Sequence, residues 1–372
     1  MRRRPAMENL TRAIEELCRA GLAPAALRDQ VLPRLRRAVP FDAAFWSTAD
    51  PGTLLFTAPH QEEIPPHTVA AFLENEFSAG DVNSFASLAR DPGGVRTLAQ
   101  ATGGDLDASP RHRDILRPLG LGDELRAALR AGGACWGFLC LHREAGAAFG
   151  ADEADYVRRL APRLAEGIRA GLLAASVEAA DPAEAPGLVL LGGDGSLLSV
   201  TDAGRHWLDA LGHPDPERSG VPPELRALAA RLDASDRAGT AHPRLRLRTR
   251  SGRWAVLHAS HLPGADADSV AVIIDEPSPT ELAPVLMMAY GLTQQEQAVT
   301  GLVCRGLSTR EIGERLRISA LTVQDHLKSI FDKTGVRSRR ELVAAILHQQ
   351  YLPRAMAGSR VAPSGFFAPP TR

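Results

Sequence analysis

The sequence predicts a multidomain protein, in which two α+β modules precede an all-α module of four short helices. Three observations support this prediction. The chain has 372 residues, too many for one ordinary hydrophobic core and enough for two or three. Helical and strand-like patterns alternate twice over residues 8–276. Residues 285–350 then carry helical patterns only, with a helix start marked at each one.

The composition is that of a soluble globular protein, with 44% hydrophobic and 23% charged residues. The net charge of -1 argues against binding nucleic acid or a membrane over the whole surface, so any DNA-binding surface is local. Residues 291–350 carry nine Lys or Arg and six Asp or Glu, a net of +3. No apolar run is long enough to span a bilayer, and no signal peptide follows the basic N-terminus. We therefore expect a cytoplasmic protein without membrane contact.

No set of residues indicates catalysis or metal binding. The cysteines lack any CxxC or CxxH pairing, so we expect them to be reduced core residues: Cys18, Cys135, Cys140 and Cys304. No Ser/His/Asp arrangement, metal cluster or pair of carboxylates stands out. The sequence therefore predicts no enzyme, no metal and no resident cofactor.

The first module begins with two helical patterns, at residues 8–18 and 25–39. Strand-like runs follow at 44–48 and 53–57, with Asp50-Pro51-Gly52 as the turn between them. A hairpin is predicted from residues 124–130 and 134–142 around Ala131-Gly132-Gly133.

A long helix is predicted to begin near Asp152. Its apolar residues recur at three- and four-residue spacing and form one stripe, which comprises Val157, Leu160, Leu164, Ile168 and Leu172. We expect this helix to be the dimer element, with Leu160, Leu164 and Ile168 exposed to a second copy.

This order of elements resembles a GAF domain, above all from Trp136-Gly137-Phe138-Leu139 through Phe149 to the long helix. We therefore expect a GAF-like sensor domain over residues 8–176. Its aromatic residues either line a ligand cavity or form plain core: Phe45, Trp46, Phe56, Phe72, Phe77 and Trp136. His112, between Arg111 and Arg113, is interpreted as surface charge.

Residues 181–187 are predicted to be a linker, and a second α+β module follows it. A hairpin at 188–200 surrounds Gly192-Gly193-Asp194-Gly195, which lacks the Lys-Ser/Thr of a phosphate-binding loop and is read as a turn. The remaining predicted elements are helices at 202–211 and 222–232 and strands at 244–250, 254–260 and 269–275. The module resembles a PAS domain over residues 187–276. Its arginines from Arg244 to Arg250 are read as a solvated strand face, or else as a partner surface.

A helix at residues 280–289 is predicted to join the second module to the C-terminal one. Three S/T-x-x-E capping boxes mark helix starts beyond it, at Thr293, Ser308 and Ser338, and Ser319 caps a fourth helix. Gly306 and Gly335 are expected to end the first and third of these helices.

The third helix has an inner and an outer face. Val323, Leu327, Ile330 and Thr334 recur at helical spacing and are predicted to face inward, and Gly313 is expected where the second and third helices approach closely. The outer face carries polar side chains flanked by Thr322, Gln324 and Ser329, and its central positions are Leu321, Asp325, Lys328 and Asp332. A short helix with such a face, held across a tight turn, is what the major groove admits.

The segment resembles the DNA-binding domain of LuxR-type regulators, with L-T-x-x-E, G-L-S-x-x-E-I, T-V-x-x-H-L and K-x-G-V-x-S-R in register. The resemblance implies a helix-turn-helix domain at residues 285–350. It places Gln324, Asp325 and Lys328 at base edges, with Thr322 beside them. It places another set at phosphates: Thr309, Arg310, Lys333, Arg337, Arg339 and Arg340.

This chain departs from the family pattern at two places. Gln324 stands where Lys or Arg is common, and residues 294–297 lack the usual basic residues, which predicts weaker non-specific binding. Asp325 would be repelled by DNA unless it accepts a hydrogen bond from a cytosine amine. The alternative interpretations are a helical bundle that contacts protein, solvated Arg339 and Arg340, and a Lys333 that caps its own helix.

The resulting expectation is a sequence-specific regulator of transcription that binds double-stranded DNA as a homodimer. A signal sensed in the GAF-like and PAS-like modules would control it, and a small-molecule effector is one candidate for that signal. Control by a protein partner, without a small ligand, is the alternative. A degenerate sensor enzyme is a third reading. Residues 353–372 are expected to be a disordered tail.

Overall fold

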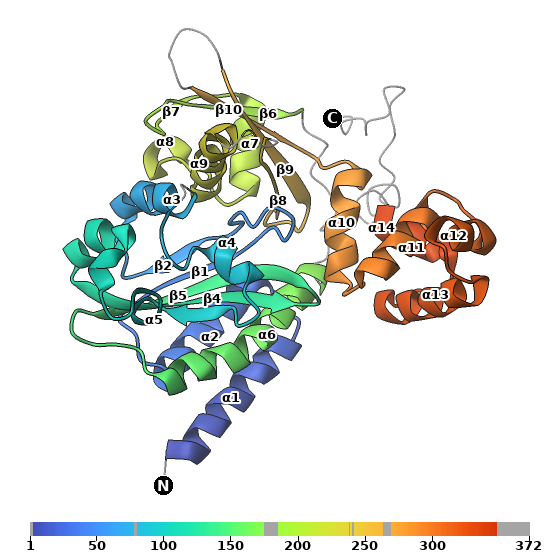
Figure 1. Cartoon of the computed structure of the whole chain (residues 1–372). Coiled ribbons are helices and arrows are strands. Elements are labelled where there is room, and N and C mark those ends of the chain that lie inside the picture. The colour runs from blue at the N-terminus through green and yellow to red at the C-terminus, as the bar shows by residue number, and fades with distance from the viewer. Residues whose placement is uncertain are drawn as a thin grey trace.

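The computed structural model describes residues 3–77, 80–174, 185–237, 239, 242–262 and 269–347. Figure 1 shows two sheet-containing modules, one above the other, and a helical module beside them. The fold class is the predicted one. Most of the linker predicted at 181–187 and the whole tail predicted at 353–372 lie outside the described residues.

Both sheets are antiparallel and have five strands in the same spatial order: second, first, fifth, fourth and third along the chain. The strands of the first module are β1 (Ala43–Thr48), β2 (His60–Glu62), β3 (Val95–Thr97), β4 (Leu121–Ala131) and β5 (Ala134–Glu144). Those of the second module are β6 (Gly187–Leu191), β7 (Leu197–Val200), β8 (Arg244–Arg248), β9 (Trp254–His261) and β10 (Val270–Asp275). The predicted hairpin between β4 and β5 is confirmed, and its turn is Gly132-Gly133, with φ of 60° and 80°.

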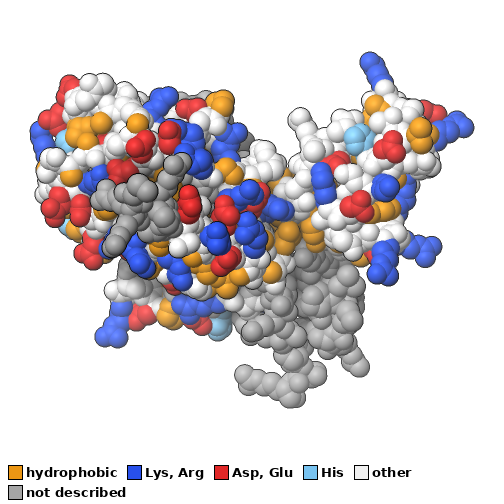
Figure 2. All heavy atoms as spheres, turned by 90° about the horizontal axis from the view of Figure 1, so that it is seen from below, with side chains coloured by type: hydrophobic (Ala, Val, Ile, Leu, Met, Phe, Trp, Pro, Cys, Tyr) orange, Lys and Arg blue, Asp and Glu red, His pale blue; other side chains and the backbone are white. Residues whose placement is uncertain are grey.

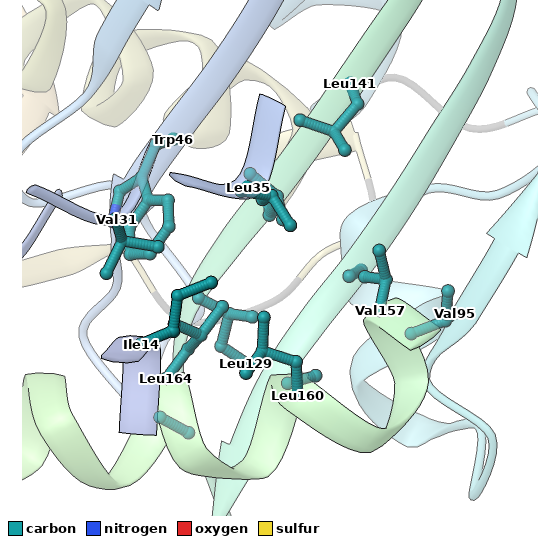
Figure 3. Close-up of a cluster of buried hydrophobic side chains, with 14 of the residues drawn as sticks. Ile14, Val31, Leu35, Trp46, Val95, Leu129, Leu141, Val157, Leu160 and Leu164 are labelled. Atoms are coloured by element: carbon teal, nitrogen blue, oxygen red, sulfur yellow. The ribbon is translucent and has the colours of Figure 1, made fainter. Parts of the chain in front are cut away.

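Three helices cover one face of the first sheet: α1 (Arg3–Arg19), α2 (Pro24–Ala38) and α6 (Ala151–Ala174). In Figure 3, Val157, Leu160 and Leu164 of α6 point into the cluster formed with Ile14 of α1 and with α2. Leu164 and Ile168 are 0% exposed and Leu160 is 3% exposed. The prediction that Leu160, Leu164 and Ile168 form an exposed dimer face is therefore wrong, because the stripe is the core of its own module.

On the other face of this sheet lie α3 (Val69–Phe77) and α4 (Phe85–Arg90), and aromatic rings fill the space beneath them. The rings of Phe85 and Phe138 stack with centroids 4.7 Å apart. The cavity that remains, bordered by Phe45, Phe56 and Phe72, measures about 70 Å³, far below the size of a typical ligand pocket. Among the candidate cavity residues, Phe45, Phe56 and Phe72 are buried in this aromatic cluster and Phe77 packs against it, whereas Trp46 and Trp136 are buried on the opposite face.

The strand predicted at 53–57 does not form. Only an isolated bridge joins Ala49 to Phe56, and β1 pairs instead with β2. Leu54 has a φ of 61°, which interrupts extended backbone, and Leu55 is 0% exposed within the hydrophobic cluster of the second module. The segment leaves the first sheet because it contributes a core residue to the neighbouring module.

A buried polar network lies on the aromatic face of the first sheet. Arg111 is 1% exposed and donates to Glu124 through Nε at 2.9 Å, and its backbone N donates to Asp81 at 2.8 Å. Arg126, 0% exposed, donates to Glu76 at 2.7 Å. The prediction that His112 and its arginine neighbours are surface charge is therefore wrong for Arg111 and His112. Burial without such partners would be costly, so the network is a strong constraint on the packing of α3.

The cysteines Cys18, Cys135 and Cys140 are buried free thiols, as predicted, and Cys304 is half-buried. Burial raises the pKa of Cys135 to about 11, so its thiol is protonated at neutral pH.

In the second module, α7 (Asp202–Ala210), α8 (Pro216–Ser219) and α9 (Pro223–Arg237) cover one face of the sheet. Leu245 and Leu247 of β8 point into this core, as predicted. The alternating arginines are not all solvated, however. Arg248 lies 5.0 Å from the Trp254 ring centroid and donates to Gly252 O at 2.7 Å, and Arg246 binds the first module.

Arg246 joins three parts of the molecule. Its guanidinium donates to both carboxylate oxygens of Asp50, at 2.8 and 2.7 Å, and Asp50 is 2% exposed. Nη1 also donates to Glu281 O at 2.9 Å, on helix α10 (Pro279–Ala289). A Cβ at Gly52 would overlap Nη2 of Arg246, so a side chain there would displace the guanidinium from this pair. Among the described helices, none combines the length and apolar character needed to cross a bilayer.

We predict that Asp50→Asn lowers the free energy of unfolding by about 3–5 kcal/mol, because it leaves the half-buried Arg246 charge uncompensated. Urea unfolding followed by circular dichroism measures the change. Arg244→Ala is the matched control on the same strand, where a 61% exposed side chain contributes less than about 1 kcal/mol. Equal losses from the two variants would contradict the role given to the Asp50–Arg246 pair.

Candidate nucleic-acid interface

The C-terminal module contains α11 (Gln294–Cys304), α12 (Thr309–Leu316), α13 (Ala320–Thr334) and α14 (Arg339–Leu347). Both hydrogen bonds of the capping box are present at Thr293 and at Ser308, and Ser319 caps α13. Only one of the two hydrogen bonds of the third predicted capping box is present. The Ser338 hydroxyl accepts from Glu341 N, but the Glu341 carboxylate accepts from Arg337 N and not from Ser338 N. Local sequence therefore positions all four helix starts.

The inner face of α13 is the predicted one. Val323 and Ile330 are 0% exposed, Leu327 is 6% exposed, and Ile312 of α12 packs in the same cluster. Thr334 is half-buried, and its hydroxyl donates to Ile330 O. This packing turns the opposite face of α13 toward solvent.

A tight turn sets the angle between α12 and α13. Arg317 ends α12 in the left-handed region, with φ of 57°. A Cβ at Gly313 would lie 2.8 Å from Ile318 O, so Gly313 is required for the approach of the turn. The close approach predicted at Gly313 is present: a Cβ there would meet the backbone of the turn and, at 3.6 Å, the backbone N of Ala320 at the start of α13.

The outer face of α13 is polar apart from Leu321, which is 68% exposed. Gln324, Asp325 and Lys328 are exposed. Within the described part of the chain, the Lys328 ammonium has no ion-pair partner, so its charge is available to a ligand. Thr322 is half-buried, and its hydroxyl lies 2.8 Å from the Ser319 hydroxyl.

The residues expected at phosphates divide into two groups. Arg337 and Arg340 are exposed, and Arg310 is exposed with a weak ion pair to Glu314. Two others, Arg339 and Lys333, contact the protein itself.

Arg339 donates to Leu307 O and to the Thr309 hydroxyl, each at 2.8 Å. It therefore ties the start of α14 to the start of α12, which brings two helix N-termini to one side of the module. This interaction between distant residues was not predicted from the sequence.

Glu296 is the polar centre of the module. This residue is 4% exposed and accepts from Thr293 N, the Ser329 hydroxyl and Lys333 Nζ, the last at 2.6 Å. Burial acts to raise the pKa of Glu296, but the hydrogen bonds from Lys333, Thr293 and Ser329 outweigh it and lower the pKa to about 2. Lys333 thus joins α13 to α11, whereas the sequence prediction placed it at a phosphate or at the end of its own helix.

Figure 2 shows the C-terminal module as a lobe beside the larger body, with Lys and Arg side chains projecting from its edge. Two short helices across a tight turn, with an exposed polar face on the second, define the helix-turn-helix class of DNA-binding domain. Residues 291–346 match the family model described as "Bacterial regulatory proteins, luxR family". The C-terminal module is therefore a LuxR-type helix-turn-helix domain, as its motifs predicted.

The chain is also similar to several solved structures. A GAF domain from a phosphoenolpyruvate-protein phosphotransferase of Coxiella burnetii is 20% identical, over 44% of this chain and 92% of that one, with a TM-score of 0.32. SdiA of Escherichia coli is 12% identical over 91% of this chain and 97% of that one, with a TM-score of 0.30. The bacteriophytochrome RpBphP3 of R. palustris is 12% identical over 73% and 63%, with a TM-score of 0.35. With TM-scores of this size, none of these likenesses bears on the function of this chain.

Gly313→Ala is expected to destabilise the helix-turn-helix domain by about 1–3 kcal/mol, because its Cβ would force the turn away from α12. Gly301→Ala is the matched control, since nothing lies within 4 Å of a Cβ in that helix and the change should stabilise by up to about 1 kcal/mol. Thermal unfolding of both variants measures the difference. The same sign of effect at both positions would contradict the close approach.

Glu296→Gln is expected to cost about 3 kcal/mol at pH 7, because the lowered pKa reflects stability that only the charged carboxylate supplies. Since the folded pKa lies below the ordinary value of 4.5, this stability is present above about pH 4.5 and is lost as the pH falls toward 2. Urea unfolding across this range should show the gap between variant and wild type closing.

Glu311→Gln is the control for the pH series, because Glu311 is an exposed capping-box carboxylate without an ion pair to lysine. The loss of unfolding free energy in Glu311→Gln should be much smaller than that in Glu296→Gln. A gap between wild type and Glu296→Gln that stays constant from pH 7 to pH 2 would refute the assignment.

Proposed function

We propose that this chain is a sequence-specific, DNA-binding regulator of transcription, and that the first two modules sense the signal that controls it. The observation that carries the proposal is the outer face of α13, where an unpaired Lys328 stands beside Gln324 and Asp325 on a LuxR-type domain. Lys328 can donate to guanine O6 or N7, and Gln324 can bind adenine. Asp325 can accept from a cytosine amine.

Phosphate contacts would come from Arg310, Arg337 and Arg340, on the side of the module where α12 and α14 begin. Helix N-termini attract phosphate through their free N–H groups and the helix dipole. Arg339 supports this surface indirectly, because it holds Leu307 and Thr309. Lys333 would contribute indirectly, because its ion pair with Glu296 joins α13 to α11.

Regulation would pass through α10. This helix packs on α14 and α11, and it also contacts both sensor modules. Arg169 of α6 donates to Ala289 O at its C-terminal end, and Arg246 donates to Glu281 O near its start. A signal that alters the packing of either module can therefore move α10 and change DNA affinity.

We further propose a homodimer in the cytoplasm that acts by binding and not by catalysis. A dimer would read an inverted repeat, and its interface would not involve the α6 stripe, because that stripe is buried. The second candidate is control by a protein partner. A stable protein complex in which no small molecule alters DNA affinity would favour that candidate.

Lys328→Ala should reduce affinity for a selected site by about 1–3 kcal/mol and should reduce affinity for random DNA much less, because Lys328 is proposed to read a base. Arg340→Ala should weaken both kinds of DNA alike and lower the salt slope by about one. Selection from a random-sequence duplex library with the full-length protein would supply the site, and fluorescence anisotropy at several salt concentrations would give both affinities.

Arg218→Ala is a suitable control, because this 89% exposed arginine lies in the second module, away from the helical one. Equal losses for selected and random DNA in Lys328→Ala would exclude base reading by this residue. A folded protein that enriches no sequence would contradict the proposed function.

A further inference from the structure

An open cleft of about 920 Å³ lies between the first and second modules, where β8 and β9 approach the loop after β1. Figure 1 shows the ends of these strands reaching down toward the first module. The volume falls within the range of small-molecule sites, unlike the 70 Å³ cavity in the aromatic core. Both modules contribute walls, so an occupant would contact both.

The ionisable side chains that line the cleft are mainly basic: Arg90, Arg231, Arg244, His242 and His258. Burial lowers the pKa of one of them, His258. Among the described residues that line the cleft, the one carboxylate is that of Glu76, which already accepts from Arg126 and from Phe85 N. Neither Arg90 of the first module nor Arg231 of the second has an ion-pair partner among the described residues. Two guanidinium groups, one from each module, therefore border the cleft without an anion.

The remaining wall combines the polar residues Thr53, Ser235 and Ser260 with apolar side chains. Leu54, Phe56, Phe77 and Phe85 line it from the first module. Ile273 lines it from the second module and is 43% exposed. Apolar walls with a few convergent polar groups are typical of ligand sites.

We propose that this cleft binds a small organic anion with an apolar body. Arg90 and Arg231 hold its carboxylate, sulfonate or phosphate, and the aromatic wall and Ile273 cover its body. Binding in this cleft is independent of the DNA role of the C-terminal module. Only the regulatory meaning of binding rests on the function proposed above.

The cleft is connected to α10 through one carboxylate. Glu281 accepts from Arg244 Nη1 at 3.2 Å and lies 3.8 Å from His258 Nε2, and both of these basic residues line the cleft. The same carboxylate accepts from Ser278 N at 2.9 Å and so caps the start of α10. A bound anion competes with Glu281 for Arg244 and His258, and thereby loosens the contact between α10 and the second module.

The experiment uses the full-length protein and two fluorescent probes with the same apolar body. One probe, 8-anilinonaphthalene-1-sulfonate, is an anion, and the other, N-phenyl-1-naphthylamine, lacks the sulfonate. The anion should bind at one saturable site and more tightly than the neutral probe. Arg231→Ala should weaken the anion about tenfold or more, the size of a charge-assisted hydrogen bond, and should leave the neutral probe unchanged.

Arg218→Ala, the exposed arginine outside the cleft, is the matched control and should change neither affinity. Arg231→Gln serves as a second variant if Arg231→Ala unfolds. Equal binding of the two probes to wild type, or anion binding that is insensitive to both Arg231 variants, would overturn the proposal.

Glu281→Gln tests the competition, because Gln keeps the capping hydrogen bond and removes the charge. The anion should then bind about two- to fivefold more tightly, the size of one partly exposed ion pair. An unchanged affinity would refute the link between the cleft and α10. If no duplex binds the protein with or without the anion, the DNA role fails while the binding result stands on its own.

Discussion

The guanidinium of Arg246 is the interaction on which the arrangement of the molecule depends. This side chain lies on a strand of the second module. It donates to the buried carboxylate of Asp50 in the first module and to a backbone carbonyl of α10. A charge removed from water is tolerated only when its partners are well placed, so these three parts cannot shift independently without leaving a charge uncompensated. Gly52 and Leu55, in the loop that follows Asp50, complete the junction by close approach and by burial.

This junction gives α10 its position. The helix lies between the first two modules and the helix-turn-helix domain, and polar contacts hold both of its ends. Between these ends, Leu282, Val285 and Leu286 of α10 are buried in the apolar core of the C-terminal module. The helix therefore contacts all three modules, which is the position that the proposed coupling between distant sites requires.

Features coded by neighbouring residues were predictable from the sequence. The capping hydroxyls at Thr293, Ser308 and Ser319 and the Gly132-Gly133 turn depend on contacts within a few residues.

Predictions that depended on distant partners were less successful. Asp50 and Arg246 are separated by 196 positions, so a motif read as a hairpin turn is part of an intermodule contact. The α6 stripe has the spacing of both a dimer face and a core face, and only the position of α1 and α2 decides between them.

Lys328 and Lys333 are the only lysines in the chain, and both lie on α13. The amine of Lys333 is engaged with a buried carboxylate, whereas that of Lys328 is exposed. A reagent that acylates amines therefore meets an unpaired lysine amine, that of Lys328, on the helix proposed to enter the major groove, whereas the amine of Lys333 is held in an ion pair. Acylation removes the positive charge of a lysine. A single covalent mark at this position would act as a chemical footprint of the groove-facing surface, protected when DNA is bound and exposed when it is released.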